Sequence, residues 1–305
     1  MKVSIAMRDR SCPLCGSMDQ SRVLAEAKFD AERLDAFAFA SRKLPEYMHH
    51  RMISCAVCDV VYASPLPTLE SLIKAYEEAA FDTSRESCYA SLTYRRFLPG
   101  IVKHLSDRVG AIDIGTGDGA FLDQLLAEGF SDVVGVEPSK APIESAQDHI
   151  RPLIRCGPFE LQPGDEARFR LVTCFQTLEH LYDPMEMCRN AYKILKNGGA
   201  VFLICHNRRS FSTKLLGTKS PIFDIEHLQL FSSKSARYML EQAGFVSVKI
   251  KTVFNRYPLH YWVKLFPIPM NLKSAVISIL KKTGVGYMLL SIPAGNIAVI
   301  GYKKG

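Results

Sequence analysis

Short apolar runs alternate with amphipathic stretches along most of the chain after residue 105. Strands that alternate with helices in this way predict βαβ units, in which helices cover both faces of a parallel sheet. We therefore expect a doubly wound α/β fold. The stretches with helical spacing are residues 121–129, 141–150, 183–199 and 232–245. The runs predicted to be strands are VGAIDI (109–114), DVVGVE (132–137), PLIRC (152–156), FRLVTCF (169–175), AVFLICH (200–206), VSVKIKTVF (246–254) and NIAVIGYK (296–303).

Further segments flank this alternation. Residues 84–107 have helical spacing and are expected to cover the sheet, and residues 255–293 form an insert between the last two predicted strands. Residues 1–65 contain two cysteine pairs and end at SPLP, whose prolines interrupt regular structure. A chain of 305 residues suits one large domain with a small appendage. We predict a head over residues 1–65 and an α/β domain over residues 66–305.

The positive charge of the chain is unevenly distributed. The net charge is +7, but residues 251–305 carry eight Lys or Arg and no Asp or Glu, so the rest of the chain is almost neutral. This basic excess of the C-terminal segment is weak support for nucleic-acid binding along the whole chain. The first residues lack the apolar core of a signal peptide, and no run of about 18 uncharged apolar residues occurs. We expect a cytoplasmic protein.

A glycine-rich loop, GAIDIGTGDGAFL, follows the first strand of the alternation. A strand that ends in such a loop and opens a helix lets backbone N–H groups approach a ligand closely. Gly115, Gly117 and Ala120 fit the dinucleotide pattern G-x-G-x-x-A, with Glu137 downstream to hold a ribose. The carboxylate of Asp113 would repel a pyrophosphate, however, whereas S-adenosylmethionine has no phosphate and carries a sulfonium and an ammonium. The charge at the loop therefore favours the sulfonium cofactor.

At this point the chain resembles the class I S-adenosylmethionine-dependent methyltransferases over about residues 85–250. Their first motif is an apolar strand, an acidic residue and G-x-G-x-G, and the stretches VVGVEPS, CGPFE, CFQTLEHLYDP and LKNGGAVFLICHN fit their later motifs in order. The resemblance implies a seven-stranded Rossmann-like sheet, a glutamate that binds the ribose hydroxyls, and an adenine wall at Phe159. The implied cofactor residues are Asp113, Gly115, Gly117, Gly119, Glu137, Pro138, Phe159 and Gln176.

Some of these positions have simpler interpretations. The loop alone is also typical of a structural turn or a nucleotide site, and Phe159 suits plain core packing about as well as adenine contact. Arg170 departs from the family, since many relatives carry an acidic residue at the start of the fourth strand.

Two C-x-x-C pairs, CPLCG and CAVC, lie in the head. Cys12, Cys15, Cys55 and Cys58 can supply the four thiolates of a tetrahedral structural zinc site, although the 39 residues between the pairs exceed the usual spacing. A redox C-x-x-C would need a thioredoxin-like unit around it. His49 and His50 are alternative ligands, but a solvated loop suits them better. The remaining cysteines are expected to be small core residues: Cys88, Cys156, Cys174, Cys188 and Cys205.

The head also resembles small cysteine-pair domains that precede some methyltransferases of sugar and polysaccharide pathways. A hydroxyl or carbon acid needs a general base in order to accept a methyl group, and histidine suits that role near neutral pH. His180 and His227 lie where the family places acceptor-site residues, and Asp224 and Glu226 stand beside His227 to orient it. We take His227, His180 and Glu226 as catalytic candidates. The alternative is that these residues only cap a helix and pack.

We therefore expect a methyltransferase that acts on a small-molecule or carbohydrate-like acceptor, at oxygen in the first place and at carbon as the alternative. An RNA methyltransferase with a zinc finger is a rival, but the head lacks the dense basic and aromatic residues that nucleic acid requires. A non-catalytic zinc-bearing scaffold is another rival. In the insert, Tyr257, His260, Tyr261 and Trp262 are expected to wall the acceptor pocket. An alternative role for this lysine-rich insert is peripheral contact with an anionic membrane.

Overall fold

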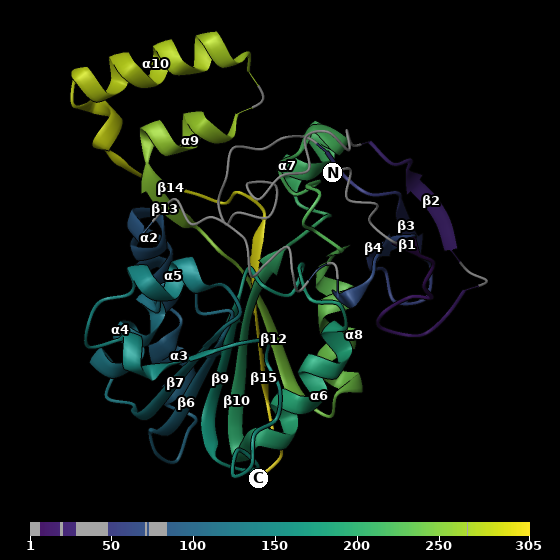
Figure 1. Cartoon of the computed structure of the whole chain (residues 1–305), viewed down its shortest axis with the longest axis vertical. Coiled ribbons are helices and arrows are strands. Elements are labelled where there is room, and N and C mark those ends of the chain that lie inside the picture. Colours follow the sequence, from purple (N-terminus) through teal and green to yellow (C-terminus); the bar gives the residue numbers. More distant parts are fainter. Residues whose placement is uncertain (1–6, 19–20, 29–47, 71, 73–83, 267) are drawn as a thin grey trace.

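The computed structural model describes residues 7–18, 21–28, 48–70, 72, 84–266 and 268–305. A seven-stranded sheet lies at its centre (Figure 1), as the sequence predicts. Each strand pairs with its neighbour in parallel except β15, which runs antiparallel to both β10 and β12. In spatial order the strands are β12 (Val246–Thr252), β15 (Asn296–Tyr302), β10 (Leu195–His206), β9 (Phe169–Phe175), β6 (Val109–Ile114), β7 (Ser131–Glu137) and β8 (Ile154–Cys156).

The order in which the chain adds strands to the sheet changes side between the parallel neighbours β6 and β9. From β6 the chain passes to β7 and β8 on one side, and it then returns to β9 and β10 on the other side. Ligands of open α/β sheets bind outside the carboxyl ends of the strands at such a switch point. The topology alone therefore places the functional site above the ends of β6 and β9.

Helices cover both faces of the sheet, so the inner strands are mostly buried, while the edge strands β12 and β8 are partly exposed. One apolar core contains side chains of α6 and α8, and the second contains side chains of α2, α3 and α4. The N-termini of α6 and α8 are capped by Asp183, which accepts from the Glu186 N–H, and by Ser232, which accepts from the Ser235 N–H. The helices are α2 (Ser84–Arg95), α3 (Leu98–Val102), α4 (Ala120–Ala127), α5 (Lys140–Ser145), α6 (Pro184–Ile194) and α8 (Ser233–Gln242).

Several element boundaries differ from the expected ones. The helical segment predicted over 84–107 is divided into α2 and α3, and the helix predicted over 141–150 already ends at Ser145. The helix predicted over 183–199 ends at Ile194, and β10 begins directly after it. Gly198 within the expected helix has φ +74°, a left-handed value that a right-handed helix does not accommodate.

The head does not stand apart from the large domain. Its strands β2 (Ser21–Ala25), β3 (Met52–Cys55) and β4 (Val61–Ala63) form a sheet with β11 (Gln229–Leu230), which comes from the large domain and pairs with β4. Arg10 in the head also donates hydrogen bonds to the carbonyls of Leu228 and Tyr182. Two short strands, β1 (Met7–Arg8) and β5 (Leu66–Pro67), pair with each other.

The C-terminal insert lies between β12 and β15 and is built on a hairpin of β13 (Asn255–Pro258) and β14 (Leu289–Ile292). At its tip are α9 (Leu259–Leu265), α10 (Met270–Lys282) and the 3-10 turn η4 (Val285–Tyr287). Together with α7 (Phe211–Leu216), these helices lie beyond the carboxyl ends of the parallel strands (Figure 1). No helix in the described ranges is both long and apolar enough to cross a membrane.

Candidate cofactor and acceptor site

A cavity of about 910 Å³ lies above the switch point of the sheet. The loops that follow β6, β7, β9 and β10 form its floor, and residues of α7 and of the C-terminal insert line its other side. Seven of the eight cofactor positions and all three catalytic candidates named from the sequence line this cavity, and Gly119 lies behind the loop against Ile150. The fold therefore brings both sets of residues to one place.

The glycines of the loop are required for different reasons. Gly115, Gly117 and Gly119 all have φ between +59° and +72°, which side-chain-bearing residues adopt at a cost. A Cβ at Gly115 would collide with Thr177, and one at Gly119 would collide with Ile150. A Cβ at Gly117 would meet no atom within 4 Å, so the backbone there borders open space on the side of the cavity. Gly117 is therefore the glycine at which a ligand can approach the backbone.

Asp113 is the penultimate residue of β6 and is 3% exposed. Its carboxylate accepts hydrogen bonds from Thr116 Oγ1 at 2.8 Å and from Thr173 Oγ1 at 2.6 Å. Burial outweighs these two bonds and raises the pKa of Asp113 to about 7. Asp113 therefore anchors the glycine loop to the sheet and titrates in the neutral range.

Glu137 ends the neighbouring strand, β7, and is also buried. Its Oε2 accepts the N–H of Gly117 and its Oε1 accepts the N–H of Ser139, both at 2.9 Å. Burial raises the pKa of Glu137, while the two backbone bonds act in the opposite direction. Each oxygen has a second lone pair, so the carboxylate can accept further hydrogen bonds from a diol in the cavity.

Gln176 follows β9 directly and has φ +54°, a left-handed value that is uncommon outside glycine. Its N–H donates to the Ile204 carbonyl at 2.7 Å, which fixes this backbone. Its side-chain Nε2 is buried and has no hydrogen-bond partner among the described residues. Buried amides are normally paired, so a ligand group in the cavity is the partner that this geometry requires. Phe159 lines the cavity and also packs against the core, so both interpretations of this residue apply.

Three histidines meet at the acceptor side of the cavity. The ring of His227 lies 4.9 Å from that of His180 and 5.2 Å from that of His206, measured between centroids. His227 Nδ1 lies 2.8 Å from the Ile222 carbonyl, which can only accept, so Nδ1 carries the proton. In the neutral ring the basic lone pair is then on Nε2, and this lone pair makes His227 competent as a general base.

The acidic residues include one partner that the sequence did not predict. Glu226 Oε2 lies 3.5 Å from His180 Nδ1, which pairs the two catalytic candidates with each other. Asp224 lines the same cavity.

His206 was missed by sequence reasoning. It ends β10, and its Nδ1 lies 2.8 Å from Asn296 Oδ1. Its backbone N–H donates to Oε1 of the fully buried Glu179 at 2.5 Å, and Glu179 Oε2 has no partner among the described residues. Burial raises the pKa of Glu179. The signal for His206 was its place at the carboxyl end of a central strand, the same signal that identified Glu137.

The insert supplies an aromatic wall. Tyr257, Tyr261 and Trp262 line the cavity as predicted, and the indole N–H of Trp262 donates to the Leu290 carbonyl at 3.2 Å. His260 was wrongly included in this wall. Its Nδ1 lies 2.7 Å from the Gly286 carbonyl, within the insert.

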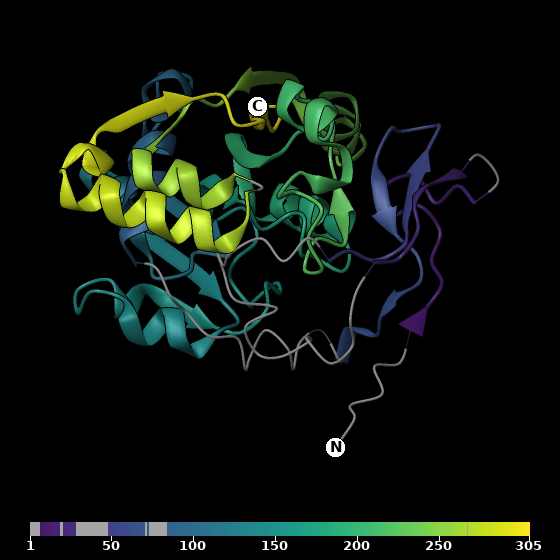
Figure 2. The same cartoon turned by 90° about the horizontal axis from the view of Figure 1, so that it is seen from above.

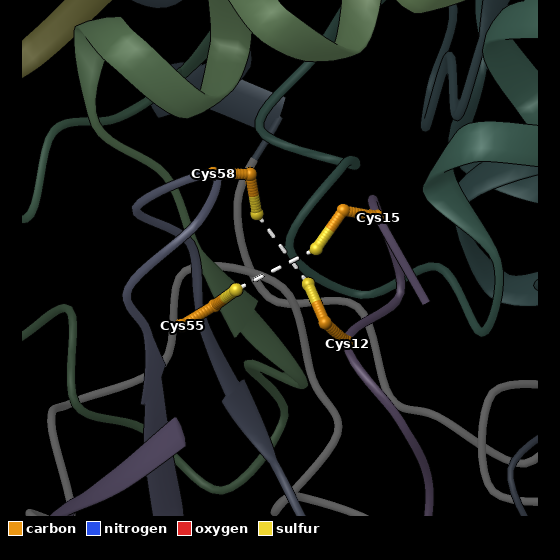
Figure 3. A group of neighbouring side chains, drawn as sticks. All are labelled: Cys12, Cys15, Cys55 and Cys58. Atoms are coloured by element: carbon orange, nitrogen blue, oxygen red, sulfur yellow. Dashed lines mark hydrogen bonds between the residues drawn. The ribbon is translucent and has the colours of Figure 1, made fainter. Parts of the chain in front are cut away.

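The two cysteine pairs form one cluster (Figure 3), in which the four sulfurs point toward a common centre. Cys12 Sγ lies 3.4 Å from Cys58 Sγ, and Cys15 Sγ lies 3.6 Å from Cys55 Sγ. Four sulfurs at the usual Zn–S bond length of about 2.3 Å lie about 3.8 Å apart in a tetrahedron. The donor set and its dimensions therefore fit a zinc ion.

Other expectations for the cysteines and for the head were partly wrong. His49 and His50 are buried rather than solvated, and His49 Nδ1 bonds to the His50 carbonyl, so the cluster contains only cysteines among the described residues. Cys88 and Cys156 are exposed rather than in the core, because they lie on outward positions of α2 and the edge strand β8. Arg170 lies at the amino end of β9, away from the cavity, and pairs with Asp107.

Comparisons with known proteins agree with this architecture. Residues 89–250 match the model of a family described as "Methyltransferase domain". Relatives named ubiquinone biosynthesis O-methyltransferase are similar in part: that of Coxiella burnetii is 33% identical over 32% of this chain, and that of Pseudomonas aeruginosa 31% identical over 35%. These matches span 43% and 50% of the relatives' own lengths.

Solved structures share the fold. The YcgJ protein of Bacillus subtilis covers 69% of this chain and 99% of its own, with a TM-score of 0.50 and 17% identity. This likeness concerns the fold alone. Since the family model spans more than half of the residues, and since the glycine loop and the strand ends that form the cavity floor lie within the matched range, the chain belongs to the methyltransferase domain family.

Proposed function

We propose that this protein transfers a methyl group from S-adenosylmethionine to a hydroxyl of a small-molecule or carbohydrate-like acceptor. One observation carries the proposal. The acidic ends of two central strands and a cluster of three histidines open into a single cavity. A cofactor that carries positive charge and a diol suits the part of the cavity with the acidic strand ends, which we call the cofactor end. An acceptor that must lose a proton suits the part with the three histidines, which we call the acceptor end.

The cofactor end favours a cationic ligand over a dinucleotide. In dinucleotide sites the loop N–H groups bind phosphate. Here the N–H of Gly117 donates to the Glu137 carboxylate, so an anionic group already occupies that donor. Asp113 and Glu137 lie near the carboxyl ends of the adjacent strands β6 and β7, where Asp113 is opposite Gly135, and their combined charge would repel a pyrophosphate. The buried amide of Gln176 remains to bind a polar group of the ligand.

The acceptor end supplies proton removal. When bound, S-adenosylmethionine would supply an electrophilic methyl group, which passes to the acceptor oxygen as its bond to sulfur breaks and S-adenosylhomocysteine leaves. His227 Nε2 accepts the hydroxyl proton as the O–C bond forms, and the imidazolium is stabilised by the Ile222 carbonyl at Nδ1–H. The nearby carboxylate of Glu226 adds negative charge to this cluster. Transfer to carbon would use the same base on a carbon acid, and the names of the relatives favour oxygen.

The remaining residues that line the cavity indicate what kind of acceptor fits. Tyr257, Tyr261 and Trp262 of the insert line the cavity, and so do the apolar residues Phe211, Leu215 and Leu216 of α7. An acceptor with one apolar side and one hydroxyl near the histidines fits both surfaces.

A methyl-transfer screen tests the proposal. The purified protein is incubated with S-adenosylmethionine and a panel of phenolic, sugar and lipid-linked hydroxyl compounds, and S-adenosylhomocysteine is measured. We expect acceptor-dependent product, and methylation at oxygen is read from the mass and NMR spectra of the acceptor. If calorimetry detects no binding of S-adenosylmethionine, the proposed cofactor is wrong. Turnover only with structured RNA would instead favour an RNA methyltransferase.

We further propose that the four cysteines hold one structural zinc ion. The sulfur-to-sulfur distances support this assignment, and such a site stabilises a small head whose own apolar core is limited. The cluster lies outside the cavity lining, so its role is in the fold rather than in the methyl transfer.

A further inference from the structure

The mouth of the cavity carries some of the most exposed large apolar side chains of the described chain. Phe211 and Leu215 on α7 are 81% and 72% exposed, and Phe266 at the end of α9 is 63% exposed. All three also line the cavity, so they form its rim. A folded protein rarely leaves such a group in water unless it meets another surface.

The helix α10 extends this apolar surface. Leu272 and Ile279 lie seven residues apart, two turns along one side of the helix, and both are more than half exposed. Figure 1 places α10 above α9, at the same end of the molecule as α7. Viewed from above, α9 and α10 lie in yellow-green across one side of this end (Figure 2). The helices α7, α9 and α10 therefore belong to one end of the molecule, and exposed apolar residues at α7 and at the end of α9 line the cavity.

The segments that carry α7 and the insert have formal charges of one sign. Residues 207–223 and 251–305, which carry α7 and the insert, contain no Asp or Glu. Their cations include Lys214 and Lys219 beside α7 and Lys281 and Lys282 at the end of α10, all exposed. None of these four lysines forms an ion pair with an acidic side chain that the structure describes. Lysines that flank exposed apolar residues suit a membrane surface, in which anionic headgroups cover apolar acyl chains.

We infer that this end of the protein, the rim of α7 and α9 with α10, docks on an anionic lipid surface. The apolar residues enter the headgroup boundary, and the lysines contact acidic headgroups. The aliphatic character of α10 favours lipid over single-stranded nucleic acid, whose binding surfaces use aromatic residues that stack on bases. The docked mouth opens toward the lipid, so the cavity can receive an acceptor that has an apolar tail without passing it through water.

Vesicle flotation tests the inference without cofactor or turnover, so its outcome is separate from that of the proposed methyl transfer. The full chain is floated with vesicles of phosphatidylcholine alone and of phosphatidylcholine mixed with phosphatidylglycerol. We expect binding only to the anionic vesicles, and loss of that binding on going from about 0.05 M to about 0.5 M salt.

Variants locate the surface. Lys281→Gln combined with Lys282→Gln should weaken binding to the vesicles at least about tenfold. Each lysine near an anionic membrane strengthens binding by its own attraction to the headgroups, and two such contributions are lost. Ile279→Ser should also weaken it. The matched controls are Lys103→Gln combined with Lys193→Gln, and Leu126→Ser, all exposed positions outside the docking end, and these should bind as the parent does.

Three results would overturn the inference. The first is absence of binding to anionic vesicles at low salt. The second is a dimer in sedimentation equilibrium that Ile279→Ser dissociates, which would assign the apolar surface to a second copy of the chain. The third is binding of RNA that Lys281→Gln with Lys282→Gln abolishes, together with no flotation.

Discussion

Asp59 in the head and Arg209 in the large domain are joined across 150 residues of sequence, with Arg209 Nε donating to Asp59 Oδ2 at 2.7 Å. The same carboxylate accepts from the Ser232 hydroxyl at 2.6 Å and pairs with Arg208. Asp59 directly follows a cysteine of the cluster, and Arg209 lies three residues beyond His206. The cysteine cluster and the histidine side of the cavity are therefore connected through one buried carboxylate.

Replacement of this carboxylate should destabilise the protein. Asp59→Asn removes the charge that compensates the largely buried Arg208, and we expect the free energy of unfolding to fall by about 2–4 kcal/mol, below the full cost of breaking a buried pair because Arg209 is exposed. Denaturant unfolding followed by circular dichroism measures this. Asp132→Asn is the control, since the pair of Asp132 with Arg168 lies at the surface and should cost under about 1 kcal/mol. Equal effects of the two changes would contradict the prediction.

The pH dependence of stability should reflect the same residue. Hydrogen bonds and charges of the arginines and Ser232 lower the pKa of Asp59 below its usual value. The ionised form is thus favoured by folding, so its contribution is complete above the unfolded pKa of about 4 and is lost as the pH falls through the folded value. Asp59→Asn should flatten the acid side of the stability profile relative to the parent. A parallel profile in the variant would show that other carboxylates dominate.

Cofactor binding should depend on the ionisation of Asp113. Its pKa of about 7 in the cofactor-free protein means that the carboxylate is present above that pH and protonated below it. A cationic cofactor binds the ionised form better, so its affinity should fall by up to about tenfold per pH unit below 7, with proton release on binding. Calorimetry in buffers of different ionisation enthalpy measures both effects. Asp113→Asn should bind weakly at every pH, and a remaining pH dependence would point to the histidines.

Glu137 should carry affinity for the ribose end of the cofactor. Glu137→Gln replaces an acceptor-only carboxylate by an amide and disturbs the bonds from Gly117 and Ser139. We expect cofactor binding to weaken by about 1–3 kcal/mol, the usual cost of leaving buried polar partners unpaired. The matched control is Glu160→Gln, an exposed glutamate that follows the neighbouring strand β8. An unchanged dissociation constant for Glu137→Gln would remove this residue from the cofactor site.

His227 should control turnover rather than cofactor binding. His227→Asn removes the base, and we expect kcat to fall by about 10²–10⁴-fold with little change in cofactor affinity. His149→Asn, at an exposed histidine paired with Asp123, should be silent. If His180→Asn or His206→Asn abolishes activity while His227→Asn retains it, the base is another member of the cluster.

Removal of metal should unfold the head first. A strong chelator or Cys12→Ser with Cys55→Ser should release about one zinc per chain, lower the melting temperature and leave cofactor binding partly intact. Elemental analysis and differential scanning fluorimetry measure these effects. Intact mass under denaturing conditions provides the check: a mass four hydrogens below that of the thiol form would indicate two disulfides and count against the zinc site.

The sequence by itself determined the parts that depend on short-range pattern. The period of apolar residues predicts the strands of the central sheet, and the parallel order follows from the helices between them. The glycine loop with Asp113, the acid at the end of the next strand and the two cysteine pairs are each recognisable within a few residues. The structure brings the loop, Asp113 and Glu137 to one cavity and the four cysteine sulfurs to one cluster.

Only the tertiary structure decided the contacts between distant segments. His206 joins the histidine cluster because β10 ends beside residues that come from other loops, and its place at the end of a strand does not by itself show which residues it meets. β11 completes the sheet of the head, and Asp59 finds its arginines, through chain separations of about 150 residues or more. Exposure is decided in the same way: His49 is buried, and Ile279 faces solvent, because burial depends on what the rest of the chain packs against a side chain and not on the side chain itself.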